Sequence, residues 1–323
     1  MQIKKAVITA GGRGVRLYPA ADTVQKAMLP IIDRDGLAKP AIQIIAEEAL
    51  ASGVETICIV CAPGDESQYR HQLKSLRDNL AVAYTGTDWA AQQVAQLDDL
   101  GKRLEFVAQE EPLGYGHAVY CARSFVGEEP FLLLLGDHLY SSHVPGRRCA
   151  EQVVRLAVEE GCAVAAVQAT REHLIGRYGT LSGKRVAEKP GVYQIERILE
   201  KPSLSLAEQE LLTQGLRAGY YLCFFGMHVL PHRVFDLLEP AIRAGADANG
   251  GIQLTPALDE LASREKYLAL EVQGRRYDTG ARFGLLQAQV ALALAGRDRD
   301  EVLATLMELL AEACKQGGAG ADA

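Results

Sequence analysis

The chain has 323 residues, of which 48% are apolar and 23% charged, proportions typical of a globular protein. Its net charge of −7 excludes the overall basic field that attracts nucleic acid or an anionic membrane. The longest apolar run, residues 131–135, is too short to span a bilayer, and the first residues do not form a signal peptide. We therefore expect a cytoplasmic protein that binds any phosphate through locally placed cations.

Short apolar runs alternate with amphipathic stretches up to about residue 170. The predicted strands are 3–9, 55–61, 104–108, 131–136 and 162–168, and the predicted helices are 39–52, 66–77, 114–124 and 147–160. This alternation is typical of a mostly parallel sheet covered by helices on both faces. Residues 80–100, which contain the only tryptophan, are expected to form an insertion after the second unit.

From about residue 178 the pattern changes to strands joined by turns, in the segments Y-G-T-L-S, V-Y-Q-I-E-R-I-L-E and R-A-G-Y-Y-L-C-F-F-G-M-H. Helices are predicted again near 232–239 and 253–263, then a strand near 267–272 and a helical stretch over 281–314 that is interrupted around Gly296. We predict one elaborated domain over residues 1–295, a C-terminal helical segment over 296–316 and a disordered tail over 317–323.

The chain contains seven cysteines, an odd number. Cys58 and Cys61 flank two apolar residues of a predicted strand, where alternation points them to opposite faces. Cys162 and Cys223 also lie in apolar runs. We expect buried free thiols in a reducing compartment, and no disulfide or metal framework.

The first predicted strand leads into A-G-G-R-G-V-R, and Lys26 follows Arg16 by ten residues, in Q-K-A-M-L-P. Adjacent glycines let the backbone approach a ligand and present N–H groups to phosphate oxygens, and the two cations add positive charge. A dinucleotide fingerprint is excluded because Leu17 stands where its third glycine should be, and no Walker-type Gly-Lys-Ser/Thr follows. The segment predicts a polyphosphate loop of another kind, although such turns also occur without a ligand.

A second segment, Q-E-E-P-L-G-Y-G-H-A-V, begins at Gln109 where another strand ends. Its side-chain amide both donates and accepts, which complements the edge of a pyrimidine. Gly114 and Gly116 open the next predicted helix and permit close approach by a flat ring. The alternative is a solvent-facing Gln at an ordinary junction. We interpret His117 as structural or substrate-orienting, because an ionised phosphate needs no general base.

Two aspartates follow predicted strands. Asp137 comes one glycine after the run L-L-L-L, at the carboxyl end of a central strand, where open α/β sheets bind ligands. Asp278 lies in R-Y-D-T-G. Both are candidate ligands of one Mg²⁺ shared with nucleotide phosphates, or else turn residues. Glu200 and Lys201 close a further strand, where they can bind sugar hydroxyls and a sugar phosphate or form a solvated surface ion pair.

The order of these motifs resembles that of the bacterial UTP–glucose-1-phosphate uridylyltransferases, within the wider family of sugar-phosphate nucleotidyltransferases. The resemblance runs over residues 5–286 and rests on A-G-G-R-G-V-R, K-A-M-L-P, Q-E-E-P-L-G-Y-G-H-A-V, L-G-D, Y-G-T, the second E-K-P, A-G-Y-Y, G-I-Q-L-T and Y-D-T-G. It implies a Rossmann-like, GT-A-type α/β fold with a mostly parallel mixed sheet, flanking helices, added β-hairpins and C-terminal helices. Within the family, the segment Q-E-E-P-L-G-Y-G-H-A-V marks the uridylyl branch over the thymidylyl branch.

The resemblance also implies substrates and residue roles. The sugar phosphate would attack the α-phosphorus of UTP in line, with Mg²⁺ assisting, to give UDP-glucose and pyrophosphate. The implied nucleotide-binding residues are Ala10, Gly11, Gly12, Gln109 and Gly114, the last two at the uracil. The implied catalytic cations are Arg16, Lys26 and Lys201, and the implied Mg²⁺ ligands are Asp137 and Asp278. The implied glucose 1-phosphate site consists of Gly179, Glu200 and Lys201, with Tyr220 or Tyr221 nearby.

The chain departs from the family pattern at several positions. Val15 stands where Thr is usual, and Gln25 and Ala27 alter the usual P-K-E-M-L-P. Gly250 and Gly251 precede I-Q-L-T where an acidic residue is usual, and a bulkier His follows Asp137. Two alternatives therefore stay open: another hexose 1-phosphate or dTTP as substrate, or a non-catalytic nucleotide-sugar-binding relative.

An apolar stripe at helical spacing lies near the C-terminus, at Val302, Leu303, Leu306, Leu309 and Leu310. It can pack on its own domain or on a second copy. With the family resemblance, it leads us to expect a homo-oligomer, a dimer or tetramer.

Overall fold

The computed structural model describes residues 1–12, 24–245 and 251–318. Its main sheet has the strand order β5-β4-β1-β6-β11-β8-β12-β10-β9. The bounds are β1 (Lys5–Thr9), β4 (Thr56–Cys61), β5 (Leu104–Ala108), β6 (Phe131–Leu135), β8 (Ala163–Arg171), β9 (Gly179–Arg185), β10 (Val192–Glu200), β11 (Tyr220–Leu230) and β12 (Tyr267–Glu271). Two further ribbons pair β2 (Pro30–Ile32) with β3 (Ala38–Pro40), and β7 (His138–Ser142) with β13 (Gly274–Asp278).

The two halves of the sheet differ in strand direction. Strands β5, β4, β1 and β6 are parallel to one another, whereas β11 runs antiparallel to β6, β8 and β9. The chain passes from β1 to β4 on one side and later to β6 on the other, so the strand order reverses at β1. In open α/β sheets a ligand crevice forms outside the carboxyl ends of the strands at such a point. The architecture confirms the predicted Rossmann-like α/β class.

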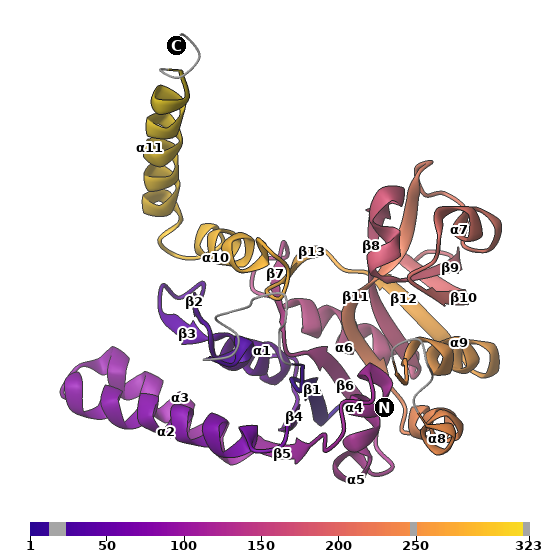
Figure 1. Ribbon diagram of the computed structural model, residues 1–323, viewed down its shortest axis with the longest axis horizontal. Helices are drawn as coiled ribbons and strands as arrows, with labels where there is room; N and C mark the ends of the chain where they lie inside the picture. The colour runs from indigo at the N-terminus through magenta and orange to yellow at the C-terminus, as the bar shows by residue number, and fades with distance from the viewer. Residues whose placement is uncertain (13–23, 246–250, 319–323) are drawn as a thin grey trace.

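Helices cover both faces of this sheet (Figure 1). Their bounds are α1 (Ala41–Leu50), α2 (Asp65–Ala83), α3 (Asp88–Arg103), α4 (Tyr115–Cys121), α5 (Arg123–Val126), α6 (Cys149–Glu160), α7 (Leu204–Glu210), α8 (Val234–Ala244), α9 (Thr255–Arg264), α10 (Gly284–Leu294) and α11 (Arg299–Gly318), with 3-10 turns η3 (Lys26–Met28) and η4 (Glu172–Arg177). Alternation along β1 creates two cores: Ala6 and Ile8 pack in the core that includes α1 and α6, and Val7 packs in the one that includes α4, α8 and α9.

The segment expected to be an insertion is helical. The predicted helix 66–77 extends over α2, and residues 88–103 return as α3, so the two form a long pair that projects to one side in Figure 1. The rings of Tyr84 and Trp89 lie 4.9 Å apart at its turn, while Tyr69, Leu97 and Leu100 are buried nearer the sheet. The short apolar strip of these helices gave too weak a periodic signal for the sequence to show their full length.

The C-terminal helical stretch is broken at Gly296, as predicted. A Cβ on Gly296 would lie 2.9 Å from the Arg34 carbonyl oxygen, so the chain passes too close to the β2–β3 ribbon for a side chain. Beyond it, α11 projects away from the body in Figure 1 and includes the first two residues of the predicted tail, while 319–323 lie outside the described residues.

All seven cysteines are free, and Cys58 and Cys61 pack in different cores, which confirms the expectation for that strand. Cys314 is the exposed one. Within the described ranges, no helix has the length and apolar character needed to cross a membrane.

Candidate active site

Three loops meet at the carboxyl ends of β4, β1 and β6. The Ala10 N–H donates to the Val60 carbonyl at 2.7 Å, and the Gly136 N–H donates to the Thr9 carbonyl at 2.9 Å. A Cβ on Gly136 would lie 2.9 Å from the Ala10 Cβ, so this crossing requires glycine. Ala10, directly after β1, is thereby fixed between Val60 and Gly136. Arg16, the first predicted phosphate ligand on this loop, lies outside the described residues.

The second predicted cation, Lys26, does reach this loop. It begins η3, and a Cβ on Gly12 would lie 3.5 Å from its Nζ. The same Nζ lies 2.6 Å from Asp137 Oδ2. The structure therefore brings the second loop glycine, one predicted cation and one predicted metal ligand into direct proximity.

Asp137 is held as a carboxylate. His138 Nδ1 lies 2.8 Å from its Oδ1, on the side opposite Lys26. Burial raises the pKa of Asp137, but the hydrogen bond with His138 and the charge of Lys26 outweigh burial and hold this pKa well below its ordinary value. An ionised carboxylate is the form that binds a divalent cation.

Asp278 joins this group through the β7–β13 ribbon. It pairs directly with His138 across the ribbon, and the next residue, Thr279, donates from both its N–H and its hydroxyl to the Asp137 carbonyl, at 2.8 and 2.9 Å. One ligand atom each from Asp137, His138 and Asp278 all lie within 4.8 Å of one another. Two carboxylates suit a hard divalent cation such as Mg²⁺, so Asp137 and Asp278 fit the metal ion expected for this site, with His138 in contact with Asp137.

Gln109 and Gly114 also come together, as predicted. Gln109 Nε2 lies 3.1 Å from the Gly114 carbonyl oxygen and 3.1 Å from His117 Nδ1. A Cβ on Gly11 would lie 2.9 Å from Gln109 Oε1, so the amide faces the first loop glycine. Gly114 has φ +109°, and a Cβ there would lie 2.6 Å from the Ile252 carbonyl oxygen, so glycine is required on both counts.

Glu200 and Gly179 are opposite each other in the β9–β10 pair. The Thr255 hydroxyl donates to Glu200 Oε2 at 2.6 Å, which fixes the carboxylate. Lys201 has φ +45°, a strained conformation for a residue other than glycine, and its Nζ lies 3.4 Å from Glu200 Oε1. Its side chain is 56% exposed, so the ammonium is available to a ligand.

The aromatic residue in contact with Gly179 lies on β11, as Tyr220 and Tyr221 do. Tyr220 accepts a hydrogen bond from Arg171, and Tyr221 is buried in a small core with residues of η4 and α7. Instead, a Cβ on Gly179 would lie 2.6 Å from the ring of Phe224, three residues further along β11. The register of β11 against β9, in which Cys223 pairs with Thr180, brings Phe224 to Gly179, and the sequence does not reveal this register.

Two further residues of this region escaped the sequence analysis. Burial raises the pKa of Tyr115, and the charges of the Asp137 and Glu200 carboxylates raise this pKa further. Arg276 donates to the Phe224 carbonyl and lies 4.0 Å over the ring of Tyr178. Its position two residues before Asp278, on the same face of a strand, was the available signal.

Residues 5–293 match the family model described as nucleotidyl transferase. The chain belongs to this family. The nucleotidyl transferase is 33% identical over 316 residues to UTP–glucose-1-phosphate uridylyltransferase YngB of Bacillus subtilis strain 168, covering 98% of each chain. It is also similar to two solved structures. A UDP-glucose pyrophosphorylase complexed with UDP-glucose is 28% identical, with a TM-score of 0.70 over 90% of this chain and 98% of that one. A UTP-bound UGPase from Acinetobacter baumannii is 27% identical, with a TM-score of 0.75, and the match covers 95% of this chain and 100% of that one.

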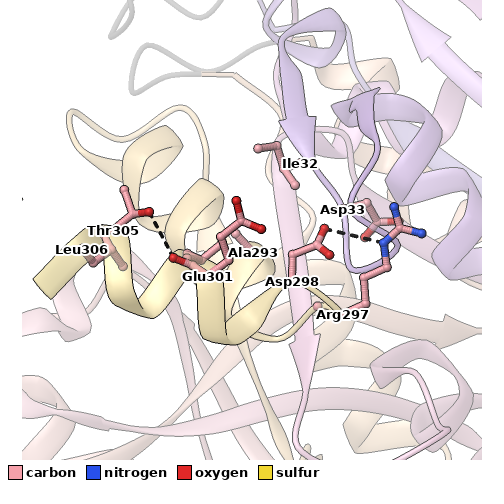
Figure 2. Close-up of a pocket in the computed structure, with 11 residues that line it drawn as sticks. Ile32, Asp33, Ala293, Arg297, Asp298, Glu301, Thr305 and Leu306 are labelled. Carbon is pink, nitrogen blue, oxygen red and sulfur yellow. Dashed lines mark hydrogen bonds and ion pairs between the residues drawn. The ribbon is translucent and has the colours of Figure 1, made fainter. Parts of the chain in front are cut away.

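A separate pocket of about 300 Å³ lies between the β2–β3 ribbon and the α10–α11 junction (Figure 2). Asp33, Asp298 and Glu301 line it together with Arg297, which pairs with Asp298. An excess of carboxylates does not suit a polyphosphate. The strand ends, and not this pocket, are therefore the candidate active site of this nucleotidyl transferase.

Proposed function

We propose that this nucleotidyl transferase transfers the uridylyl group of UTP to glucose 1-phosphate, giving UDP-glucose and pyrophosphate. The observation that carries the proposal is the convergence of three sets of groups at strand ends. Gln109 lies beside Gly11, Lys26 contacts Asp137 and lies beside Gly12, and Glu200, fixed by Thr255, pairs with Gly179. The names of the relatives supply the substrate pair.

In this proposal Gly11, Gln109 and Gly114 bind the uracil end, and Ala10, Gly12, Arg16 and Lys26 bind the phosphates. Gly179, Glu200 and Lys201 bind the sugar phosphate. Asp137 and Asp278, with His138 beside them, would hold Mg²⁺, which supplies positive charge to the phosphates when bound.

Both substrates are anions, so the enzyme must reduce their repulsion and align them. Lys201 at the sugar end offsets the charge of the attacking phosphate. Lys26 at the loop end takes up charge on the leaving pyrophosphate. The sugar phosphate is itself the nucleophile, so no side chain has to form a covalent bond.

The test is the release of pyrophosphate from UTP, Mg²⁺ and glucose 1-phosphate, with UDP-glucose identified by chromatography. Asp137→Ala and Asp278→Ala should each lose most of the activity. Near-wild-type turnover in both variants would contradict the roles that we assign to them.

One observation favours another hexose 1-phosphate as the alternative substrate. Gly251 has φ +89°, and a Cβ there would lie 2.5 Å from the Leu113 carbonyl oxygen, so no side chain fits at this position. The acidic residue that is usual before I-Q-L-T is therefore missing, and Glu200 is the carboxylate that we assign to the sugar. A panel of hexose 1-phosphates, with dTTP beside UTP, distinguishes the two: glucose 1-phosphate should rank first, and a low rank supports the alternative. UDP-glucose binding without turnover would indicate a non-catalytic relative.

We further propose that the enzyme is a cytoplasmic homo-oligomer. The seven free thiols support a reducing compartment. On α11 the side chains of Leu303, Met307, Leu309 and Leu310 are exposed, which supports packing against a second copy. Sedimentation of the purified chain tests the assembly, with a dimer or tetramer expected and a monomer contradicting it.

A further inference from the structure

The orientation of the Gln109 amide is determined by a backbone carbonyl. The Gly114 carbonyl oxygen can only accept a hydrogen bond, so the amide group 3.1 Å from it must be the nitrogen, Nε2. The same nitrogen lies 3.1 Å from His117 Nδ1. Because Nε2 carries only protons to give, Nδ1 must accept, and the proton of the neutral His117 ring is on its Nε2.

This arrangement leaves one group of Gln109 for a ligand. Both protons of Nε2 are donated within the protein, so Oε1 remains for a ligand. This oxygen faces Gly11, because a Cβ on Gly11 would lie 2.9 Å from it. Gln109 is buried, with 8% of its surface exposed, so water can replace few of these contacts. A carbonyl oxygen at this position requires a ligand that donates.

Uracil and cytosine differ at the atom that would meet this oxygen. Uracil carries a proton on N3 and donates there, whereas N3 of cytosine is an unprotonated acceptor beside an amino group. With Oε1 toward the base, uracil gains a hydrogen bond and cytosine places two acceptors together. Reversal of the amide would invert this preference.

We propose that His117 is a positioning residue for nucleotide selection: it accepts the second proton of Gln109 and so keeps Oε1 toward the base, favouring UTP over CTP. The inference rests on the proposed function, since it needs the base to lie beside Gly11. The backbone next to His117 is closely packed. The Gly116 N–H donates to the Ile252 carbonyl at 2.8 Å, and neither Gly114 nor Gly116 has room for a Cβ.

A matched pair of variants tests this role. In His117→Asn, the side-chain oxygen takes the place of Nδ1 and can still accept from Gln109. In His117→Leu, the side chain has the same branched shape as asparagine but no hydrogen-bond acceptor. Cys121→Ala is the control, because Cys121 Sγ lies 3.9 Å from the other nitrogen of the same ring. Thermal unfolding of each variant establishes that it is folded.

The quantity to measure is kcat/KM for UTP divided by that for CTP, with glucose 1-phosphate as the second substrate. His117→Leu should lower this ratio by about five- to tenfold, the value of one hydrogen bond. His117→Asn and Cys121→Ala should keep the wild-type ratio. An equal loss for both nucleotides in His117→Leu, with the ratio unchanged, would overturn the proposal, because a merely structural role does not distinguish the two bases.

Calorimetric binding of UDP and CDP gives a second readout that needs no turnover. His117→Leu should narrow the difference between the two affinities, and His117→Asn should preserve it. If the wild-type chain forms no UDP-glucose, the proposed function fails while the binding ratio still tests His117. If it forms UDP-glucose and the binding ratio is the same in all variants, only the role of His117 fails.

Discussion

The ammonium of Lys26 lies 2.6 Å from the carboxylate of Asp137. Only 12% and 16% of these two side chains is exposed, so water screens the pair weakly. The cation that we assign to the phosphates is thus paired with the carboxylate that we assign to the metal ion. In the proposed function, Lys26 would leave Asp137 to contact a phosphate, and Asp137 and Asp278 would hold the metal ion, which would supply positive charge.

Replacement of Lys26 should therefore have two opposite effects. Lys26→Met should lower kcat/KM by about 10²–10³-fold, because a cation at the leaving phosphates is lost. It should also tighten Mn²⁺ binding in the absence of nucleotide, because the competitor for Asp137 is gone. Electron paramagnetic resonance of free Mn²⁺ measures the second effect. Lys4→Met, which removes a cation paired on the surface with Glu55, is the control and should change neither quantity. Weaker Mn²⁺ binding by Lys26→Met would contradict the competition.

The hydroxyl of Thr255 should matter for the sugar and not for the nucleotide. Thr255→Val leaves one Glu200 oxygen without its donor, so the KM for glucose 1-phosphate should rise about five- to tenfold while the KM for UTP stays constant. Thr255→Ser restores the hydroxyl and should restore the KM. Steady-state kinetics with each substrate varied in turn provides the measurement. A change confined to UTP would place Thr255 at the wrong end of the site.

Alanine substitutions at two glycines with positive φ distinguish the cost of backbone strain from the cost of crowding. Gly64, at φ +84°, has nothing within 4 Å of an added Cβ, whereas Gly114, at φ +109°, lies against Ile252. Gly64→Ala should lower the free energy of unfolding by about 1 kcal/mol through strain alone. Gly114→Ala should lower it more and also weaken UTP binding, because the Ile252 backbone must shift. Urea unfolding measures the free energy of unfolding, and calorimetry measures UTP binding. Equal effects of the two substitutions would contradict the packing argument.

The buried His228 should make stability depend on pH. Its Nδ1 lies 2.9 Å from the Tyr267 hydroxyl, and burial lowers its pKa to about 3. Between about pH 6.5 and 3 the unfolded chain binds a proton at this residue and the folded chain does not, so the free energy of unfolding falls as the pH falls through that range. His228→Gln should remove this contribution to the change of the free energy of unfolding with pH. Urea unfolding at several pH values tests it, and the same slope in both proteins would exclude His228 as its source.

The sequence predicts which residues meet at the strand ends, because its signals there are local. Short apolar runs mark β1, β5 and β6, and parallel strands end at one edge, which brings Gly11, Gln109 and Asp137 together. The pairing of Asp278 with His138 could not be predicted. His138 joins it through the pairing of β7 with β13, whose residues are separated by more than a hundred positions and carry no shared local pattern. The contact of Thr255 with Glu200 is long-range in the same way.

A crystal structure of the chain with UDP-glucose and Mg²⁺ tests most directly whether one crevice binds base, phosphates and sugar. The account predicts the uracil against Gln109 and Gly114, the diphosphate beside Gly12, and the glucose next to Glu200. Ligand density in the pocket of Figure 2, or at any position away from these residues, would contradict it.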